Sequence, residues 1–581
     1  LVREAGIWDQ LGQTQRHILG LDMEGSVIGF TAHVQNVPSF IVAKGVMDYA
    51  EPDRGQGFRE FAARAAAEVL LGFLRRHLAP LPRRTPAEIL KPNTAQRPEA
   101  ASPATLLNTR YQVVPFFEAL RQRELDVLDA WCREDGAASV RLLVGPGGSG
   151  KTRLMIHWSS QLRAAEPAWH AGFLPERVTA EDLDTLLAGD QPTLIVVDYS
   201  ETRSGLIELL RRLAARPVSG RPPCRVVLLA RDIGDWWLAL RQQDAEIADL
   251  LDRDEPLRLA PVPLEGDLRR QVFEQARECF DAYQHRKSET EAGKSPLSTW
   301  ERGGVRAIAP AVPDLSDERY GRVLYLHMAA LTAVDGLSAP ADRILAEVLT
   351  HEEHFWLRVY PERHAERAKG TGLLHAAEFA AGMRRTVAGT TLLGGLASRG
   401  AVESLLGRIR GPDLPAVSLF LHWLYPGHAD TGRQAAWVSG LEPDLLGEAL
   451  VARVLADRDT PQDYLEQIFG DGGQAALRNG FVVLGRIALW DERQATAWLA
   501  RLLEADVPGR VRAAFDAALS LGGCTALAPL GQVLAAALVR SGSPELAAEI
   551  APLVPLQTVS LREVGLWAVR TLVDRPLPSS L

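Results

Sequence analysis

Cysteine is scarce in this chain: 581 residues contain only four, and no two are spaced as a Cys-x-x-Cys pair. That scarcity speaks against a disulfide framework and against a zinc site. Long apolar runs are scarce as well, because the stretch 526–539 is interrupted by Pro529, Gly531 and Gln532. Such a segment is too short and too broken to span a bilayer, and no signal peptide is visible. We therefore expect a cytoplasmic protein with no membrane partner.

Positive charge is not in excess either. The net charge is −9 and the pI is about 5.9, so the composition does not indicate nucleic acid as a partner. Apolar residues make up 46% of the chain, which is enough for sizeable cores, and the length predicts about three to five domains. The chain opens on Leu1 in what reads as the middle of a domain, and its last helical pattern has no obvious cap. We therefore expect it to be part of a longer protein at both ends.

The most specific motif is Gly145-Pro-Gly-Gly-Ser-Gly-Lys-Thr152, which has the spacing G-x-x-x-x-G-K-S/T. The apolar run 142–144 before it predicts a buried strand, and a helical pattern follows. In such a loop, backbone N–H groups and the helix N-terminus face phosphate oxygens. Lys151 is expected to reach the β- and γ-phosphates, and Thr152 to ligate Mg²⁺. The predicted binding residues for ATP and Mg²⁺ are Gly145, Pro146, Gly147, Gly148, Ser149, Gly150, Lys151, Thr152 and Arg153.

Two further apolar runs predict parallel strands beside the first. Residues 193–197 form an uninterrupted run that ends at Asp198, which makes Asp198 the candidate carboxylate (Walker B) for Mg²⁺. Residues 225–230 form another run, which ends at Arg231. Strands alternating with helical stretches predict a doubly wound parallel α/β sheet with its ligand at the carboxyl ends of the strands.

The order of these pieces resembles the STAND class of signal-transduction ATPases, which are relatives of the NB-ARC and AAA+ proteins. The resemblance rests on 114–116, Asp198-Tyr-Ser-Glu-Thr-Arg203 and Leu228-Leu-Ala-Arg231. It implies that Arg231 senses the γ-phosphate, and that Val323 stands where the class has an adenine-contacting proline.

The resemblance also raises the question of the hydrolytic acid, because Tyr199 stands where an acid usually follows the Walker B aspartate. Glu201 is the nearest substitute that could polarise water. The alternative is that Glu201 is a plain acid at a helix start. The predicted catalytic set is Lys151, Asp198, Glu201 and Arg231.

The first unit, residues 1–79, contains a predicted strand at 40–44 and an amphipathic helix from 58 to 78. Its segments Leu21-Asp-Met-Glu-Gly-Ser26 and Gly45-Val-Met-Asp-Tyr-Ala50 resemble the last third of the nucleoside phosphorylase and nucleosidase family. The resemblance implies that Glu24 holds ribose hydroxyls, Met23 packs on the sugar and Asp48 protonates the purine. The alternative is that Glu24 and Asp48 are ordinary surface carboxylates.

The remaining boundaries follow from composition. Residues 80–105 are rich in proline and predict a linker, and 106–262 hold the predicted P-loop core. Residues 263–360 predict a helical lid, with a disordered insertion at 283–316. Residues 361–581 predict a helical region, winged-helix-like or repeat-like, without a fixed period.

Together these features predict an ATP-binding, slowly hydrolysing switch that controls a nucleosidase-like effector, with bacterial signalling or antiviral defence as the implied setting. Its partners would be ATP or ADP, further copies of itself on activation, and an unknown trigger ligand at the C-terminal repeats. The alternative is a non-catalytic nucleotide-binding scaffold that recruits partners through its helical repeats.

Overall fold

The computed structural model describes residues 41–45, 58–77, 84–92, 98–217, 220–251, 255–291, 312–363, 376–409, 411, 416–427, 436–470, 472–522 and 529–573. The chain divides into two compact units, Leu1–Arg83 and Arg84–Leu581. In the first unit, helix α3 (Arg59–His77) matches the helix expected from the sequence. The strand expected at 40–44 is not formed over the described residues 41–44, where no neighbouring strand pairs with them. Met23, Glu24 and Asp48 lie outside the described residues.

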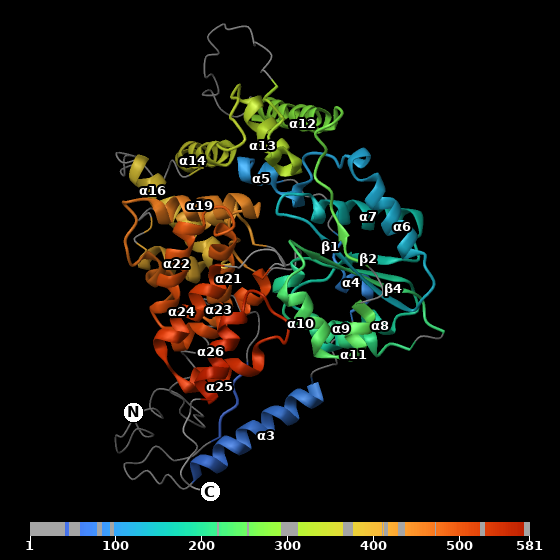
Figure 1. The fold of residues 1–581 in the computed structure, drawn as a ribbon, viewed down its shortest axis with the longest axis vertical. Coiled ribbons are helices and arrows are strands. Elements are labelled where there is room, and N and C mark those ends of the chain that lie inside the picture. Colours follow the sequence, from blue (N-terminus) through green and yellow to red (C-terminus); the bar gives the residue numbers. More distant parts are fainter. Residues whose placement is uncertain are drawn as a thin grey trace, which may run out of the picture. The chain divides into compact units, whose positions relative to one another are not determined.

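The second unit is built on a five-stranded parallel sheet (Figure 1). Its strands are β1 (Ala138–Val144), β2 (His170–Phe173), β3 (Thr193–Val197), β4 (Cys224–Ala230) and β5 (Leu257–Arg258). The three apolar runs predicted a parallel sheet and three of its strands, β1, β3 and β4. The order of the five strands is β2-β3-β4-β1-β5, so β1 lies between β4 and β5. The P-loop therefore starts from the interior of the sheet, next to the end of β4, and the end of β3 lies one strand further away.

Helices cover both faces of this sheet, which makes it doubly wound. Alternate strand residues point to opposite faces. Leu143, Val196 and Leu229 pack in one cluster with residues of α6 (Gln122–Cys132) and α7 (Lys151–Ala165). Leu142 and Leu228 pack in the other cluster with residues of α8 (Ala180–Ala188), α9 (Leu206–Ala214), α10 (Asp235–Gln243) and α11 (Ala245–Leu251). Burial on both faces explains why the strands read as continuous apolar runs.

The segment expected to be a linker, 80–105, is packed in its described parts. It forms α4 (Pro86–Ile89) and α5 (Pro103–Leu107), each with proline in its first turn. Ile89 and Leu107 are buried, and the backbone of Lys91 pairs with Phe173 at the edge of the sheet. Proline is tolerated at the first helical position, so proline-rich composition alone does not separate a linker from short helices.

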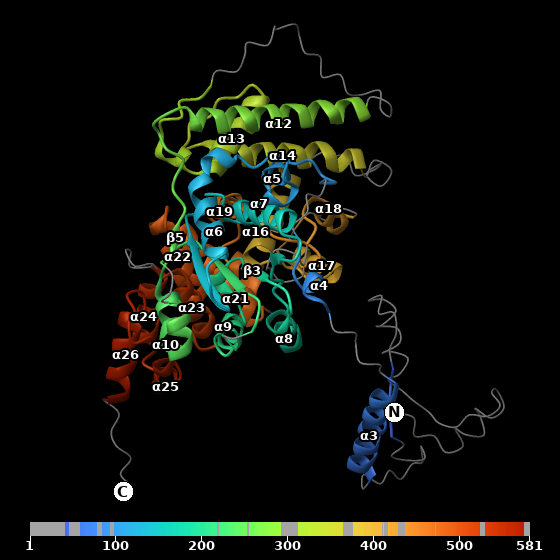
Figure 2. The ribbon, with the colours of Figure 1, turned by 90° about the vertical axis from the view of Figure 1, so that its right-hand side faces the viewer.

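The region expected to form a lid contains α12 (Leu268–Glu291), α13 (Val323–Val334) and α14 (Ile344–Arg363), with α13 packed against both of the others (Figure 2). Helix α12 continues to Glu291, so the insertion expected from residue 283 does not begin there. Residues 312–316 are described, and most of the insertion, 292–311, lies outside the described residues.

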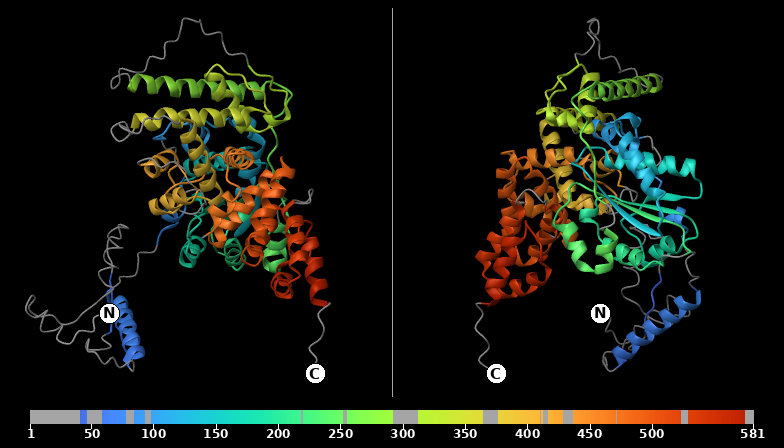
Figure 3. Two further views of the ribbon diagram at one scale, coloured as in Figure 1. Left: turned by 90° about the vertical axis from the view of Figure 1, so that its left-hand side faces the viewer. Right: turned by 45° about the vertical axis from the view of Figure 1, so that its right-hand side comes forward.

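The C-terminal region is helical, as expected, and shares one continuous hydrophobic core with the lid. Two isolated antiparallel bridges join Val438 to Leu396 and to Pro426. Figure 3 shows these helices, in yellow to red, beside the sheet. Among the described residues, no helix is both long and apolar enough to cross a membrane. The helices of this C-terminal region are α16 (Ala376–Leu393), α17 (Arg399–Arg408), α18 (Val417–Leu424), α19 (Asp444–Ala456), α20 (Tyr464–Phe469), α21 (Gln474–Ile487), α22 (Glu492–Glu504), α23 (Val507–Leu521), α24 (Pro529–Ser541), α25 (Pro544–Ile550) and α26 (Arg562–Val573).

Candidate nucleotide site

The P-loop leaves the end of β1 and turns into α7 through two glycines in the left-handed region. Gly148 has a φ of 79° and Gly150 a φ of 98°, conformations that favour glycine because it lacks a Cβ. Gly148 also needs the space: a Cβ there would lie 2.9 Å from the Cβ of Leu324 at the start of α13. Leu324 N donates to Gly148 O at 3.0 Å, so the lid is attached to the P-loop directly.

Thr152 and Asp198 are brought together as the sequence predicts. The Thr152 hydroxyl donates to Asp198 Oδ2 at 2.9 Å, and the Tyr199 N–H donates to Oδ1 at 2.9 Å. Burial raises the pKa of Asp198 to about 6, although its hydrogen bonds and Lys151 oppose that rise. A buried carboxylate with this perturbation is stabilised by a nearby cation.

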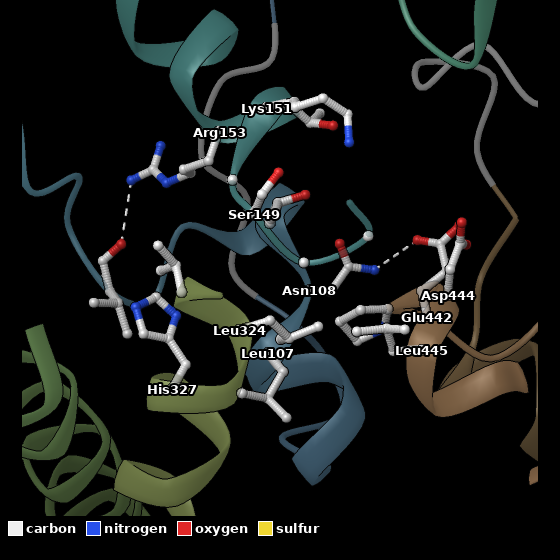
Figure 4. Close-up of a pocket in the computed structure, with 18 of the residues that line it drawn as sticks. Leu107, Asn108, Ser149, Lys151, Arg153, Leu324, His327, Glu442, Asp444 and Leu445 are labelled. Atoms are coloured by element: carbon white, nitrogen blue, oxygen red, sulfur yellow. Dashed lines mark hydrogen bonds between the residues drawn. The ribbon is translucent and has the colours of Figure 1, made fainter. Parts of the chain in front are cut away.

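Lys151 lies at the start of α7 (Figure 4). Its ammonium donates to the carbonyl oxygens of Gly145 and Pro146. Burial lowers the pKa of Lys151 to about 8, and the positive charge of Arg231 acts in the same direction. The phosphates of a bound nucleotide would give this ammonium a negatively charged partner in place of neutral carbonyl oxygens.

These residues fit Mg²⁺ only together with a nucleotide. Among the described residues, no group of three His, Cys, Asp or Glu side chains is placed to hold a metal ion. Mg²⁺ keeps few protein ligands and takes the rest of its oxygens from water and substrate phosphates. Thr152 and Asp198 would therefore hold the ion with phosphate oxygens beside it.

A pocket of about 200 Å³ joins the P-loop to an apolar end of a kind that suits a purine base. Val323, expected from the resemblance to stand near adenine, lines this pocket. Burial lowers the pKa of His327 to about 4, so the ring is neutral at pH 7. The apolar end is lined by Leu106, Leu107, Val113, Val114, Phe116, Phe117, Leu120, Val323 and Leu324.

Arg153 was expected to contact the nucleotide, and it does line this pocket. Its guanidinium, however, donates to Gln112 Oε1 at 2.8 Å and to Val114 O at 3.2 Å. Arg153 therefore holds the segment that forms the apolar end, while its contact with a nucleotide stays a prediction.

Arg231 lies beside the P-loop but is paired with the C-terminal region. A Cβ at Gly147 would lie 3.3 Å from Arg231 Cζ. The guanidinium Nη2 of Arg231 lies 2.8 Å from Asp444 Oδ2 and 2.8 Å from Glu448 Oε1, both on α19. Burial opposes the charge of Arg231, but Glu448 and Asp444 outweigh it and raise its pKa above the usual value. The positive charge of Arg231 beside the P-loop is thus already neutralised by two carboxylates of helix α19.

Arg486 of α21 extends this cluster to Glu201. Arg486 Nη1 lies 3.2 Å from Asp444 Oδ2, and its Nη2 lies 3.8 Å from Glu201 Oε1. Glu201 is 8% exposed, sits in the 3₁₀ turn Ser200–Thr202 and lines the nucleotide pocket. Its Oε2 is buried and has no hydrogen-bond partner among the described residues. That position fits the helix-start reading and leaves an oxygen for water, so both alternatives for Glu201 stay open.

Sequence reasoning missed Asp444, Glu448 and Arg486. Asp444 and Arg231 are 213 residues apart, and none of the three stands in a recognisable motif. Their only sequence signal is charge on otherwise apolar helices: Glu448 is 3% exposed and Arg486 is 6% exposed. Charged residues are rarely so buried unless they are paired.

Comparisons with known proteins give no family: no family model and no curated protein matches the chain. Among solved structures, it is similar to the Aeropyrum pernix ORC1 protein in complex with DNA, at 15% identity and a TM-score of 0.25, over 60% of this chain and 96% of that one. It is also similar to Drosophila ORC bound to DNA, at 13% identity and a TM-score of 0.22, over 75% and 79%. Drosophila ORC bound to GC-rich DNA and Cdc6 is similar at 12% identity and a TM-score of 0.22, over 82% of each chain.

These neighbours correct one prediction. The statement that nucleic acid is not indicated as a partner was wrong, because these neighbours are complexes with DNA. The TM-scores are too low to carry an argument about what this chain itself binds. Its own geometry shows a P-loop on a parallel α/β sheet. Beside that loop, Arg231 pairs with helix α19 of the C-terminal region.

Proposed function

We propose that this chain is a nucleotide-binding regulatory ATPase of the STAND type, whose C-terminal helices hold the phosphate site closed. The observation that carries the proposal is the pairing of Arg231 with Asp444 and Glu448 beside the P-loop. The residue best placed to sense phosphate is engaged by a helix of another region of the same unit. A bound γ-phosphate and the docked helix α19 would therefore both interact with the guanidinium group of Arg231.

The physics of this competition gives the switch a direction. A γ-phosphate brings negative charge to the guanidinium that Asp444 and Glu448 already neutralise. Like charges about 4 Å apart repel by about 4 kcal/mol near a protein surface. ATP should therefore weaken the docking of α19, whereas ADP, which lacks the γ-phosphate, should tolerate it. In this proposal the trigger ligand at the C-terminal helices and ATP together release the closed state, and the released protein self-associates.

The output of the switch is the nucleosidase-like effector implied by Met23, Glu24 and Asp48, in bacterial signalling or antiviral defence. The test is release of free base from purine nucleosides and nucleotides by this chain and by a version extended upstream. Activity only in the extended protein, lost in Asp48→Asn, supports the effector. Base release by the 581-residue chain that persists in Asp48→Asn rejects it.

The alternative function, a scaffold that binds nucleotide without hydrolysis, is distinguished by phosphate release. Purified protein is incubated with ATP and Mg²⁺, and inorganic phosphate is measured over hours. Double-stranded DNA is added in a parallel arm, because the ORC structures named above are DNA complexes. Phosphate release above that of Lys151→Ala supports the ATPase, and release equal to that variant supports the scaffold.

Nucleotide binding itself is tested by thermal stabilisation with ATP and Mg²⁺. Lys151→Ala should abolish the stabilisation, because it removes the buried ammonium that would face the phosphates. Lys91→Ala removes the same charge elsewhere in the same unit and should keep it. Equal shifts in wild type and Lys151→Ala would show that the nucleotide site is misassigned.

A further inference from the structure

A second cavity, of about 260 Å³, lies between the loop after β3 and the C-terminal helices. No residue of the P-loop lines it. One wall belongs to the sheet domain and the other to helices α16, α19 and α21. The sheet-domain wall consists of Glu176, Tyr199, Thr202, Arg203 and Ser204, and the helical wall includes Thr391, Asp444, Glu448, Arg478, Asn479 and Arg486.

Two arginines of α21 that line this cavity carry buried hydrogen-bond donors without an acceptor among the described residues. Among the described residues, the buried Nε atoms of Arg478 and Arg486 have no hydrogen-bond partner. Arg478 Nη2 donates to the Ser520 hydroxyl at 3.1 Å, which is a neutral partner. Burial lowers the pKa of Arg478, against the attraction of Asp516 and Glu176. Buried donors without acceptors cost free energy, and a charged donor costs more than a neutral one.

The carboxylates on the helical wall are already engaged. Asp444 and Glu448 pair with Arg231, and Asp444 also pairs with Arg486. On the opposite wall, Arg203 donates to the Pro175 carbonyl oxygen, and burial lowers its pKa against the attraction of Glu176 and Asp198. Three guanidinium groups, those of Arg203, Arg478 and Arg486, line the cavity. The carboxylate of Glu176 lines it too, while Asp444 and Glu448 pair with Arg231.

We propose that this cavity binds a compact anion of the phosphate type, held by Arg478 and Arg486 from α21 and by Arg203 from the loop after β3. Guanidinium groups match phosphate oxygens in geometry and charge. Because the two walls belong to different regions, the anion binds only while the C-terminal helices are docked, and it stabilises the docked state by mass action. If the proposed switch is correct, the same anion keeps ADP bound.

Thermal stability with the P-loop saturated by ADP and Mg²⁺ tests the site. The probes are inorganic phosphate and glucose 6-phosphate, which separate free phosphate from a phosphorylated metabolite as the source of the anion. At a tenfold excess over its dissociation constant, the bound probe should raise the melting temperature of wild type by about 1–2 °C. Arg478→Gln should lose this rise. The matched control Arg493→Gln, an exposed arginine on the neighbouring helix α22, should keep it.

A second variant guards against a folding defect in Arg478→Gln. Ala475→Asp places a carboxylate three residues before Arg478, on the lining of the cavity. It should pair with Arg478 and repel an anion while leaving the fold intact. A rise of equal size in wild type and in Ala475→Asp would overturn the proposal, as would no rise in wild type with either probe.

Release of a fluorescent ADP analogue separates this inference from the proposed switch. Phosphate or glucose 6-phosphate should slow release from wild type and leave the rate unchanged in Ala475→Asp. If ADP binds, and its release responds to Asp444 and Glu448 but not to either anion in wild type, the anion site fails and the switch stands. If ADP does not bind at all, the proposed function fails, and the thermal shift without nucleotide still tests the anion site.

Discussion

At the scale of single residues, the glycines of the P-loop have different physical tasks. Gly148 and Gly150 take positive φ values, and Gly147 and Gly148 admit close neighbours. The sequence pattern predicted the loop, Lys151, Thr152 and Asp198 because the motif encodes local backbone geometry. It could not predict that the side chain of Arg153 turns to the segment 112–114, because that contact depends on packing.

Gly148→Ala should abolish nucleotide binding. The added Cβ meets Leu324 at 2.9 Å and is strained at a φ of 79°, so the loop and the start of the lid must move apart. Gly205→Ala is the matched control, because its φ is 76° and a Cβ there meets nothing within 4 Å. The left-handed backbone should cost both variants about 1–2 kcal/mol of stability, and the contact with Leu324 adds a further cost in Gly148→Ala. Only Gly148→Ala should lose ATP binding in calorimetry, and retained affinity would show that the lid contact does not shape the site.

Glu201→Gln tests the hydrolytic acid. If Glu201 polarises the attacking water, its neutralisation should lower the single-turnover hydrolysis rate by about 10²-fold or more. Glu208→Gln, on the exposed side of α9, should hydrolyse like wild type. An unchanged rate in Glu201→Gln would leave Glu201 as an acid of the 3₁₀ turn, paired with Arg486.

At the scale of elements, the sequence predicted the three central strands β1, β3 and β4, because burial on two faces leaves continuous apolar runs. It failed where composition is ambiguous: α4 and α5 use proline in their first turns, yet proline-rich sequence is also typical of linkers. It also placed a strand at 40–44, although a strand depends on partners that an isolated apolar run does not specify.

Helix α10 contacts the loop before the last helix, α26, through Asp235, and no sequence motif predicts this contact. Asp235, 2% exposed, accepts hydrogen bonds from Thr558 Oγ1 at 2.6 Å, from Val559 N at 3.2 Å, and from the N–H and hydroxyl of Ser560. Its own N–H donates to Gly522 O at 2.9 Å. This carboxylate therefore joins the end of the C-terminal array to the helix that follows β4 and Arg231.

Asp235→Asn should loosen this attachment. The amide replaces one accepting oxygen by a donor, which leaves at least one donor of the 558–560 loop without an acceptor and costs about 1–3 kcal/mol. Hydrogen exchange should accelerate in α25 and α26 and stay unchanged in β1 and β3. The exposed control Asp249→Asn, on α11, should exchange like wild type. Equal protection of α25 and α26 in all three proteins would contradict this role.

At the scale of the whole molecule, the sequence could not reveal that the C-terminal helices close on the P-loop. The contact joins Arg231 to Asp444, which are 213 residues apart, and no sequence pattern around either residue predicts the other as its partner. Helical periodicity predicts which face of a helix is buried but not against which domain. The central claim, that nucleotide retention depends on this docking, rests on long-range pairing alone.

The most direct test is the release rate of a fluorescent ADP analogue from the double variant Asp444→Asn/Glu448→Gln. Neutralising both carboxylates leaves the buried Arg231 without its partners in the docked state and should disfavour docking by more than about 1.4 kcal/mol. ADP release should therefore be at least about tenfold faster than in wild type. The control Asp459→Asn/Glu466→Gln, which makes the same charge change at exposed positions of the same region, should release ADP at the wild-type rate. Equal rates in wild type and both double variants would contradict the account.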